Sequence, residues 1–321
     1  MALASCLAAP SKGWPSCTWR TSQRRAPGPA HSTLPCVVAC GSAIAAVWQR
    51  THQKHQRFFS ARASEPRAGH LVLQKDCEVT KSRFCRGWSI SQLREGYRYC
   101  ADDILCAYLA WQADPKAQRL LDLGSGIGSI GLAWLAQQPR GAKCTMLEAQ
   151  EVSVQLCRQT LEALQVKAVD LRHGDLRDPS TLQTLGTNFD LVTANPPYFT
   201  STSGNLPKNS QKAYCRHELR GGVSEFCSAA AQLLSPNGSF CMVHASPRLT
   251  DVLTALERYH FTIQRRVDIF FRGNYKSVAV VCSPKSASNG QQEAAAERLQ
   301  VIEEDGSWSP GYLEICELMG L

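Results

Sequence analysis

The segment Asn195-Pro196-Pro197-Tyr198 contains the residue types that point most directly to chemistry. It follows an apolar run at residues 191–194, which is typical of a buried strand. The side-chain oxygen of Asn195 and the carbonyl oxygen of Pro196 could each accept one N–H of a planar amino group. Such hydrogen bonds would aim the nitrogen lone pair at an electrophile, while the Tyr198 ring offers a face for stacking. The tetrad therefore indicates activation of a conjugated amino group, although Pro-Pro can also simply end a strand.

A glycine-rich segment supplies a second candidate site where a predicted strand changes into a helix. Gly124, Gly126 and Gly128 permit a tight turn, and the first N–H groups of the following helix are free to bind a ligand. The spacing Gly126-x-Gly128-x-x-Gly131 also matches the dinucleotide-binding fingerprint. The glycines alone therefore do not distinguish a nicotinamide dinucleotide from S-adenosylmethionine.

Three acidic residues favour S-adenosylmethionine over a nicotinamide dinucleotide. Asp122 precedes the first glycine, Glu148 ends the second predicted strand, and Asp175 follows the third. All three lie at the carboxyl edge of the expected sheet, where such sheets bind ligands. A carboxylate at Glu148 can accept both ribose hydroxyls, and one at Asp175 can accept from an adenine amino group.

The glycine segment resembles the first motif of class I S-adenosylmethionine methyltransferases, Asp-x-Gly-x-Gly-x-Gly. The tetrad resembles the fourth motif of the amino-methyltransferases, which act on adenine N6, on some guanine amino groups and on the glutamine amide of release factors. The resemblance implies that Asn195, Pro196, Pro197 and Tyr198 are catalytic. It also implies that S-adenosyl-L-methionine is held by Asp122, Gly124, Gly126, Gly128, Glu148 and Asp175.

The elements that must position these residues alternate between strand and helix. Buried strands are expected at residues 120–123, 144–148, 169–173, 191–194, 240–244, 267–271 and 278–282. Apolar residues recur at helical spacing within 223–234 and 249–259. This alternation predicts a doubly wound α/β fold, a seven-stranded, mostly parallel Rossmann-like sheet with a C-terminal antiparallel strand pair.

Sequence outside the shared core resembles the bacterial family that methylates N6 of adenine 37 in valine tRNA. The resemblance covers about residues 80 to 321 and includes Ser89-Ile90-Ser91-Gln92, residues 96–105, Arg216-His217-Glu218 and the tail from Leu299. It implies that Asp102 lies near the methionine end of the cofactor and that tRNA is the substrate. Basic residues also flank the expected pocket, and we expect substrate contacts at Phe199, Arg216, Lys212 and Arg98.

Charge and composition set residues 1–66 apart from the rest. The first acidic residue is Glu65, and residues 1–64 contain eight Lys and Arg, so the entire net charge of +8 lies there. This composition is typical of an organelle transit peptide, and a disordered tail is the alternative. We expect four parts: a presequence at 1–66, an N-terminal extension at 67–118, the methyltransferase core at 119–284, and a linker with a short C-terminal element at 285–321.

Several function classes are disfavoured. The longest apolar run, at residues 36–48, stops at 13 residues, short of a membrane-spanning helix. Eleven cysteines follow Glu65 without Cys-x-x-Cys or zinc-like spacing, so we expect reduced, mostly buried thiols and no metal.

A plastid or mitochondrial location is expected, with the cytoplasm as the alternative, and a monomer is favoured.

Two other functions stay open at this point. One is a glutamine methyltransferase acting on a release factor or ribosomal protein, although such enzymes carry a helical N-terminal domain that residues 1–66 do not resemble. The other is a Rossmann-type nucleotide-binding module without catalysis, or an NAD-dependent enzyme. The sequence does not specify which tRNA or which position is modified.

Overall fold

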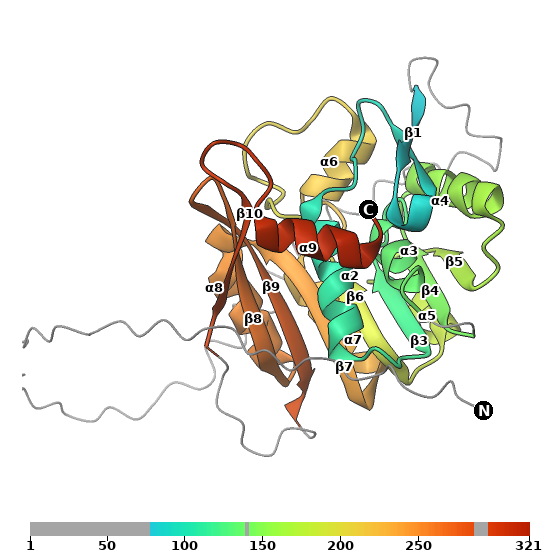
Figure 1. Ribbon diagram of the computed structural model, residues 1–321. Helices are drawn as coiled ribbons and strands as arrows, with labels where there is room; N and C mark the ends of the chain where they lie inside the picture. Colours follow the sequence, from blue (N-terminus) through green and yellow to red (C-terminus); the bar gives the residue numbers. More distant parts are fainter. Residues whose placement is uncertain (1–77, 139–140, 286–294) are drawn as a thin grey trace, which may run out of the picture. The chain divides into compact units, whose positions relative to one another are not determined.

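The computed structural model describes residues 78–321 apart from 139–140 and 286–294 (Figure 1). The expected presequence, residues 67–77 of the expected N-terminal extension and part of the expected linker lie outside these residues. The first described elements are a β-hairpin and a helix: β1 (Val79–Arg83) pairs antiparallel with β2 (Ser89–Leu93) across the short 3-10 turn η1 (Cys85–Gly87), and α2 (Ala101–Ala113) follows. The hairpin also contacts the more distant helix α4 (Glu151–Leu164), since the backbone N–H of Ser91 donates to Thr160 Oγ1 at 2.9 Å.

The centre of the fold is a mixed sheet with the strand order β10-β8-β9-β7-β6-β3-β4-β5. Its strands are β3 (Arg119–Leu123), β4 (Lys143–Glu148), β5 (Val169–His173), β6 (Phe189–Ala194), β7 (Leu234–Ala245), β8 (Phe261–Phe271), β9 (Asn274–Pro284) and β10 (Glu297–Ile302). Strands β3 to β7 run parallel to one another, whereas β9 is antiparallel to both β7 and β8. The doubly wound class and its C-terminal antiparallel pair are therefore confirmed.

The sheet contains one strand more than the sequence predicts. β10 pairs parallel with β8 at the edge of the sheet, and only one of its residues, Val301, is buried. The sequence predicts a polar linker at residues 283–298, because Glu297 and Arg298 are not part of an apolar run. The free edge of β8, rather than local hydrophobicity, extends this segment into a strand.

Helices cover both faces of the sheet (Figure 1). One core cluster joins the sheet to α2, α3 (Ser129–Leu135), α4 and α9 (Pro310–Met319). The other joins it to α5 (Pro179–Leu185), α7 (Val223–Leu233) and α8 (Leu249–Arg258). The helical patterns predicted within 223–234 and 249–259 form α7 and α8. Two short helices, α6 (Ser210–Arg216) and η2 (Ser246–Arg248), follow β6 and β7.

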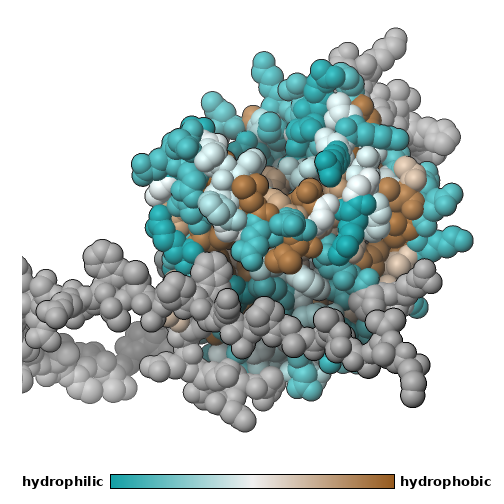
Figure 2. Space-filling model, in the orientation of Figure 1, coloured by the Kyte–Doolittle hydropathy of each residue, from teal (hydrophilic) through white to brown (hydrophobic). Residues whose placement is uncertain are grey.

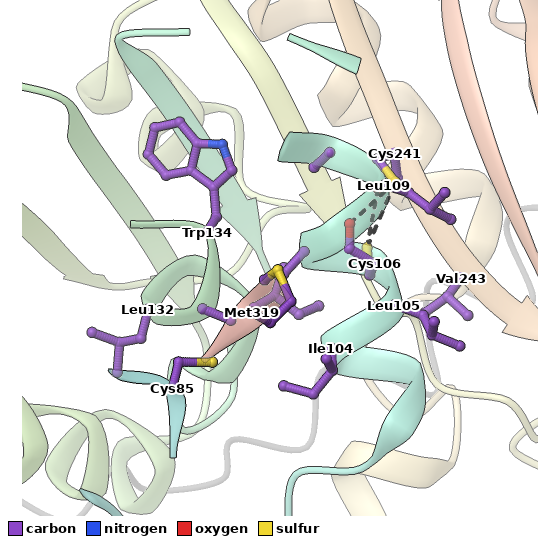
Figure 3. Close-up of a cluster of buried hydrophobic side chains, with 14 of the residues drawn as sticks. Cys85, Ile104, Leu105, Cys106, Leu109, Leu132, Trp134, Cys241, Val243 and Met319 are labelled. Atoms are coloured by element: carbon purple, nitrogen blue, oxygen red, sulfur yellow. Dashed lines mark hydrogen bonds between the residues drawn. The ribbon is translucent and has the colours of Figure 1, made fainter. Parts of the chain in front are cut away.

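Helix α2 is buried on nearly all sides. Ile104, Leu105, Cys106 and Leu109 are at most 3% exposed, and Figure 3 shows Leu105 beside Val243 of β7 and Leu109 beside Cys241 of the same strand. The Sγ atoms of Cys106 and Cys241 lie 4.0 Å apart. Each thiol donates to the backbone carbonyl oxygen of the other residue. Because α2 is fixed from several directions, its first turn is a rigid place from which to position a site.

The face of the described residues that Figure 2 shows is mainly polar, with apolar residues between. Helix α9, which crosses the face shown in Figure 1, exposes Leu313 and Leu318. No helix among the described residues is long and apolar enough to span a membrane. The described residues also contain no cluster of three His, Cys, Asp or Glu side chains that could hold a metal ion.

Candidate active site

The carboxyl ends of β3, β4, β5 and β6 surround one cavity of about 270 Å³. It is lined by the glycine loop, by the first turn of α2, by the tetrad and by residues of α6 and α7. Parallel strands place their ends at one edge, so residues up to 129 positions apart in the sequence meet here, from Tyr97 to Phe226. The two motifs singled out in the sequence therefore belong to the same site.

The glycine loop joins β3 to α3. Gly126 has φ +57°, and a Cβ built on it meets no atom within 4 Å, so the main chain lies open toward the cavity. Gly128 has φ +87°, and a Cβ there would lie 2.7 Å from Cys157 Sγ. Gly124 and Gly126 line the cavity, whereas Gly128 does not. The first two glycines are placed to approach a ligand, and the third allows α3 to pack closely against α4.

Glu148 holds this loop from the end of β4. Its carboxylate accepts the backbone N–H of Gly126 at 2.8 Å and that of Gln150 at 2.7 Å. Burial raises the pKa of Glu148, and these two N–H donors oppose the rise. The side chain is 6% exposed and lines the cavity, so its remaining lone pairs are available to ribose hydroxyls.

Asp175 lines the cavity after β5. Its carboxylate accepts hydrogen bonds from the Arg177 guanidinium, the shortest at 2.6 Å, and from the Arg177 backbone N–H at 2.9 Å. These bonds hold the pKa of Asp175 below its usual value, so the group is ionised and available as an acceptor. Its oxygens are shared between Arg177 and any ligand in the cavity.

Asp122 faces away from the cavity. It is fully buried and accepts the Thr193 hydroxyl at 2.9 Å and the Gly131 backbone N–H at 3.2 Å. Burial raises the pKa of this carboxyl to about 7. The expected contact with the cofactor is therefore indirect: Asp122 ties the first turn of α3 to β6 beneath the glycine loop.

The first turn of α2 brings two acids to the opposite side of the cavity. Asp102 Oδ2 accepts the Tyr198 hydroxyl at 2.8 Å and the Ser277 hydroxyl at 3.2 Å. Among the described residues, Asp102 Oδ1 and Ser125 Oγ are buried without a hydrogen-bond partner, and both residues line the cavity. A ligand with charged and polar termini, such as the methionine portion of S-adenosylmethionine, would supply those partners, so the residues present fit this cofactor.

Asn195 stands at the end of β6 with its amide held by α2. Its Nδ2 donates to Asp103 Oδ1 at 2.8 Å and lies 3.4 Å from the Tyr97 hydroxyl. Asn195, Pro196, Pro197 and Tyr198 all line the cavity. With Nδ2 bound to Asp103, the amide oxygen is the end of the Asn195 side chain that is left to accept a hydrogen bond.

Tyr198 of the tetrad is held by His244 and Arg248. The Tyr198 ring lies 5.2 Å from the ring of His244, and its carbonyl accepts from Arg248 at 3.4 Å. Arg248 also pairs with Glu218 at 3.0 Å. Burial lowers the pKa of His244 to about 4, so this ring is a neutral support for Tyr198 near pH 7. No sequence signal marked His244, which is the last residue of a predicted strand, or Arg248, which lies between that strand and the next helical pattern.

Two pairs of aromatic and arginine side chains lie at the cavity. The Arg216 guanidinium carbon is 5.2 Å from the Phe199 ring centroid, and that of Arg220 is 4.6 Å from the Tyr214 ring centroid. All four residues line the cavity. We name them the aromatic-arginine rim; the sequence predicted Phe199 and Arg216 but missed Tyr214, and placed Arg220 only in a group of basic residues.

The other two expected substrate residues do not line the cavity. Arg98 is exposed and donates to the Thr80 and Ser82 hydroxyls of β1, at 3.1 and 3.0 Å. Lys212 lies on α6, outside the residues that line the cavity. Asp103 is the main residue that sequence reasoning missed. Its one sequence signal was its place beside Asp102 in the segment 96–105 that carries the family resemblance.

A doubly wound sheet with this glycine loop, these strand-end acids and an Asn-Pro-Pro-Tyr tetrad defines an S-adenosylmethionine-dependent methyltransferase of class I. The chain belongs to the methyltransferase small domain family, whose model matches residues 101–262. S-adenosyl-L-methionine is therefore the cofactor that the cavity accommodates.

Relatives of this chain carry more specific names. It is 22% identical over 219 residues to the tRNA1(Val) (adenine(37)-N6)-methyltransferase of Shewanella frigidimarina, covering 64% of this chain and 86% of that protein. It is 25% identical over 237 residues to the protein of the same name from Porphyromonas gingivalis, covering 72% and 91%. Among solved structures, a predicted O-methyltransferase, Atu636, from Agrobacterium tumefaciens is similar with a TM-score of 0.49 and 18% identity, covering 68% of this chain and 97% of that one.

Proposed function

We propose that this methyltransferase transfers a methyl group to N6 of an adenosine in tRNA. The observation that carries the proposal is the fixed amide of Asn195. Because Nδ2 donates to the Asp103 carboxylate at 2.8 Å, the side-chain oxygen is left for an incoming N–H. The names of the relatives, which are tRNA adenine-N6 methyltransferases, support the same substrate.

The chain's own residues supply alignment rather than strong base catalysis. The Asn195 side-chain oxygen and the Pro196 carbonyl accept the two N–H bonds of the adenine amino group and direct the nitrogen lone pair along the line of transfer. When bound, S-adenosylmethionine supplies an electrophilic methyl group on its sulfonium. The amine loses its proton after transfer, so the site needs no group of high pKa beside the nitrogen.

The aromatic-arginine rim favours a nucleic acid over a protein glutamine. Phe199 is 40% exposed, and an exposed aromatic face can stack on a base. Among the described residues, Arg216 forms no ion pair with a carboxylate, so its charge is available to a phosphate. An adenine must leave its stack in the RNA loop to reach Asn195, and stacking surfaces at the cavity offset part of that cost.

The test measures transfer of tritium from labelled S-adenosylmethionine to unmodified tRNA transcripts and, in parallel, to a release factor. We expect label in tRNA, recovered as N6-methyladenosine after nuclease digestion, and none with Asn195→Ala. Label in the release factor alone would replace the proposal with glutamine methylation. Label in neither would leave the cofactor assignment intact but reject both substrates.

The rim provides a second measurement. Arg216→Ala removes a charge and the partner of the Phe199 ring, and Arg158→Ala, the same substitution at an exposed position of α4, serves as the matched control. We expect Arg216→Ala to raise KM for tRNA ~10-fold, with a steeper effect at low salt. An unchanged KM would show that RNA binds elsewhere.

A further inference from the structure

The Asp103 carboxylate, buried to 2% exposure in the first turn of α2, gathers four hydrogen-bond donors. Oδ1 accepts from Asn195 Nδ2 at 2.8 Å and from the Tyr97 hydroxyl at 3.4 Å. Oδ2 accepts from the Cys100 backbone N–H and from the Ser129 hydroxyl, both at 3.2 Å. The same group therefore caps α2, touches the first residue of α3 and holds the tetrad.

A carboxylate can only accept hydrogen bonds, and this restricts its neighbour. The two ends of an asparagine amide have nearly the same shape, so packing alone does not select one orientation. An Asn195 oxygen turned toward Asp103 would face a negative charge and leave the NH₂ group directed at the cavity. The ionised carboxylate selects the opposite orientation, in which the amide oxygen faces the cavity.

We propose that Asp103 is a positioning residue that sets the amide orientation of Asn195 and thereby keeps an acceptor oxygen at the methyl-transfer site. This inference rests on the proposed amino-group chemistry. Asp103 acts through Asn195 and does not itself touch the transferred methyl group or the acceptor. Asp102, its neighbour, serves a different part of the site, because its hydrogen bonds go to Tyr198 and Ser277.

The inference predicts a pH dependence. Burial raises the pKa of Asp103 to about 6, and the hydrogen bond from Asn195 opposes that rise. The titratable groups that face it are Asp102 on α2, Asp122 on β3, Tyr198 after β6 and Cys215 on α6, together with Tyr97 and Cys100 before α2. Protonation converts one oxygen of Asp103 into a donor, which permits Asn195 to reverse, so the rate should fall as the pH drops through about 6.

The first experiment replaces the carboxylate by an amide of the same size. In Asp103→Asn the new oxygen can still cap the Cys100 N–H, and its NH₂ group then faces Asn195 and draws the Asn195 oxygen away from the cavity. We expect a methyl-transfer rate at least ~10-fold lower in single-turnover assays, an unchanged Kd for S-adenosylmethionine, and no inflection near pH 6. Asp114→Asn, the same substitution at the other end of α2, is the matched control and should keep the wild-type rate and profile.

The reciprocal pair separates positioning from a purely structural role. Asp103→Asn combined with Asn195→Asp places the donor on α2 and a carboxylate at the end of β6, which has an acceptor oxygen toward the cavity in either orientation. We expect the pair to be ~10-fold more active than Asp103→Asn alone. A pair no more active than that single variant, or an Asp103→Asn enzyme with the wild-type rate, would overturn the proposal.

A measurement without RNA distinguishes failure of this proposal from failure of the proposed substrate. The side-chain amide signal of Asn195 in ¹⁵N-asparagine-labelled protein, assigned by its loss in Asn195→Ala, should shift with an apparent pKa near 6. It should not titrate in Asp103→Asn, after the new signal at position 103 is assigned. An Asn195 signal that does not respond to pH between 5 and 7 in the wild-type protein would reject the Asp103 contact, whatever substrate the enzyme methylates.

Discussion

The two sides of the cavity are built in different ways. On the cofactor side, the main chain of the glycine loop is held by Glu148, 22 residues further along the chain. On the acceptor side, Asn195 and Tyr198 depend on Asp103 and Asp102, which lie 92 and 96 residues earlier. Cofactor binding is thus supported by adjacent strand ends, whereas the Asn195 amide and the Tyr198 hydroxyl are both held by the first turn of α2. Substitutions of Glu148 should change cofactor affinity and those of Asn195 should change the rate, whereas Tyr198 contacts Asp102 and so joins the two sides.

The largest expected effect breaks the acceptor side. Asn195→Ala removes the side-chain acceptor of the target amine, and we expect the single-turnover rate to fall ~10²-fold or more. The Kd for S-adenosylmethionine, measured by calorimetry, should change less than ~2-fold. A fully active variant would show that the tetrad merely ends a strand.

The second effect breaks the cofactor side. Glu148→Ala removes the ribose acceptor and the anchor of Gly126, so S-adenosylmethionine should bind ~1–3 kcal/mol more weakly. Glu148→Gln should bind S-adenosylmethionine nearly as weakly, because its NH₂ group faces one of the two backbone N–H groups from which the carboxylate accepts hydrogen bonds. At saturating cofactor the transfer rate should stay within ~3-fold of the wild type. Unchanged affinity, or tight NAD binding by the wild type, would contradict the assignment.

A smaller effect tests the residue that joins the two sides. From the sequence, stacking is the expected role of Tyr198, and Tyr198→Phe should retain most activity. The structure adds a hydrogen bond from its hydroxyl to Asp102 at 2.8 Å, so we expect Tyr198→Phe to weaken cofactor binding ~3–10-fold while the rate at saturation changes little. Tyr198→Ala should in addition raise KM for tRNA. Equal Kd values for Tyr198→Phe and the wild type would show that Asp102 does not need this donor.

The smallest functional effect is expected at Asp122. Because this carboxyl is buried outside the cavity, Asp122→Asn should leave both Kd and rate within ~2-fold. Its pKa is about 7 in the folded protein, above the unfolded value, so its contribution to stability is greatest at low pH and is lost as the pH rises through about 7. The Tm of the variant minus that of the wild type should therefore increase by ~3 °C or more as the pH rises from 5 to 8.5. A large loss of cofactor affinity would place Asp122 in the binding site itself.

Local patterns in the sequence determined much of this protein. Apolar runs specify the parallel strands, helical spacing specifies α7 and α8, and parallel topology requires the glycine loop, Glu148, Asp175 and the tetrad to share one edge. These features are predictable because each depends on residues near one another in the chain and on a rule that applies to all such sheets.

Only the tertiary structure decided which way individual side chains face. Asp122 and Asp103 are both acids beside recognised motifs, yet Asp122 turns to Thr193 beneath the loop and Asp103 turns to Asn195 at the cavity. β10 became a strand because β8 offered an edge, and Tyr214 of α6 and Arg220 beyond that helix meet at the cavity. Each outcome depends on a partner distant in the sequence, and hydrogen-bond geometry and burial at that contact, rather than residue type, determine it.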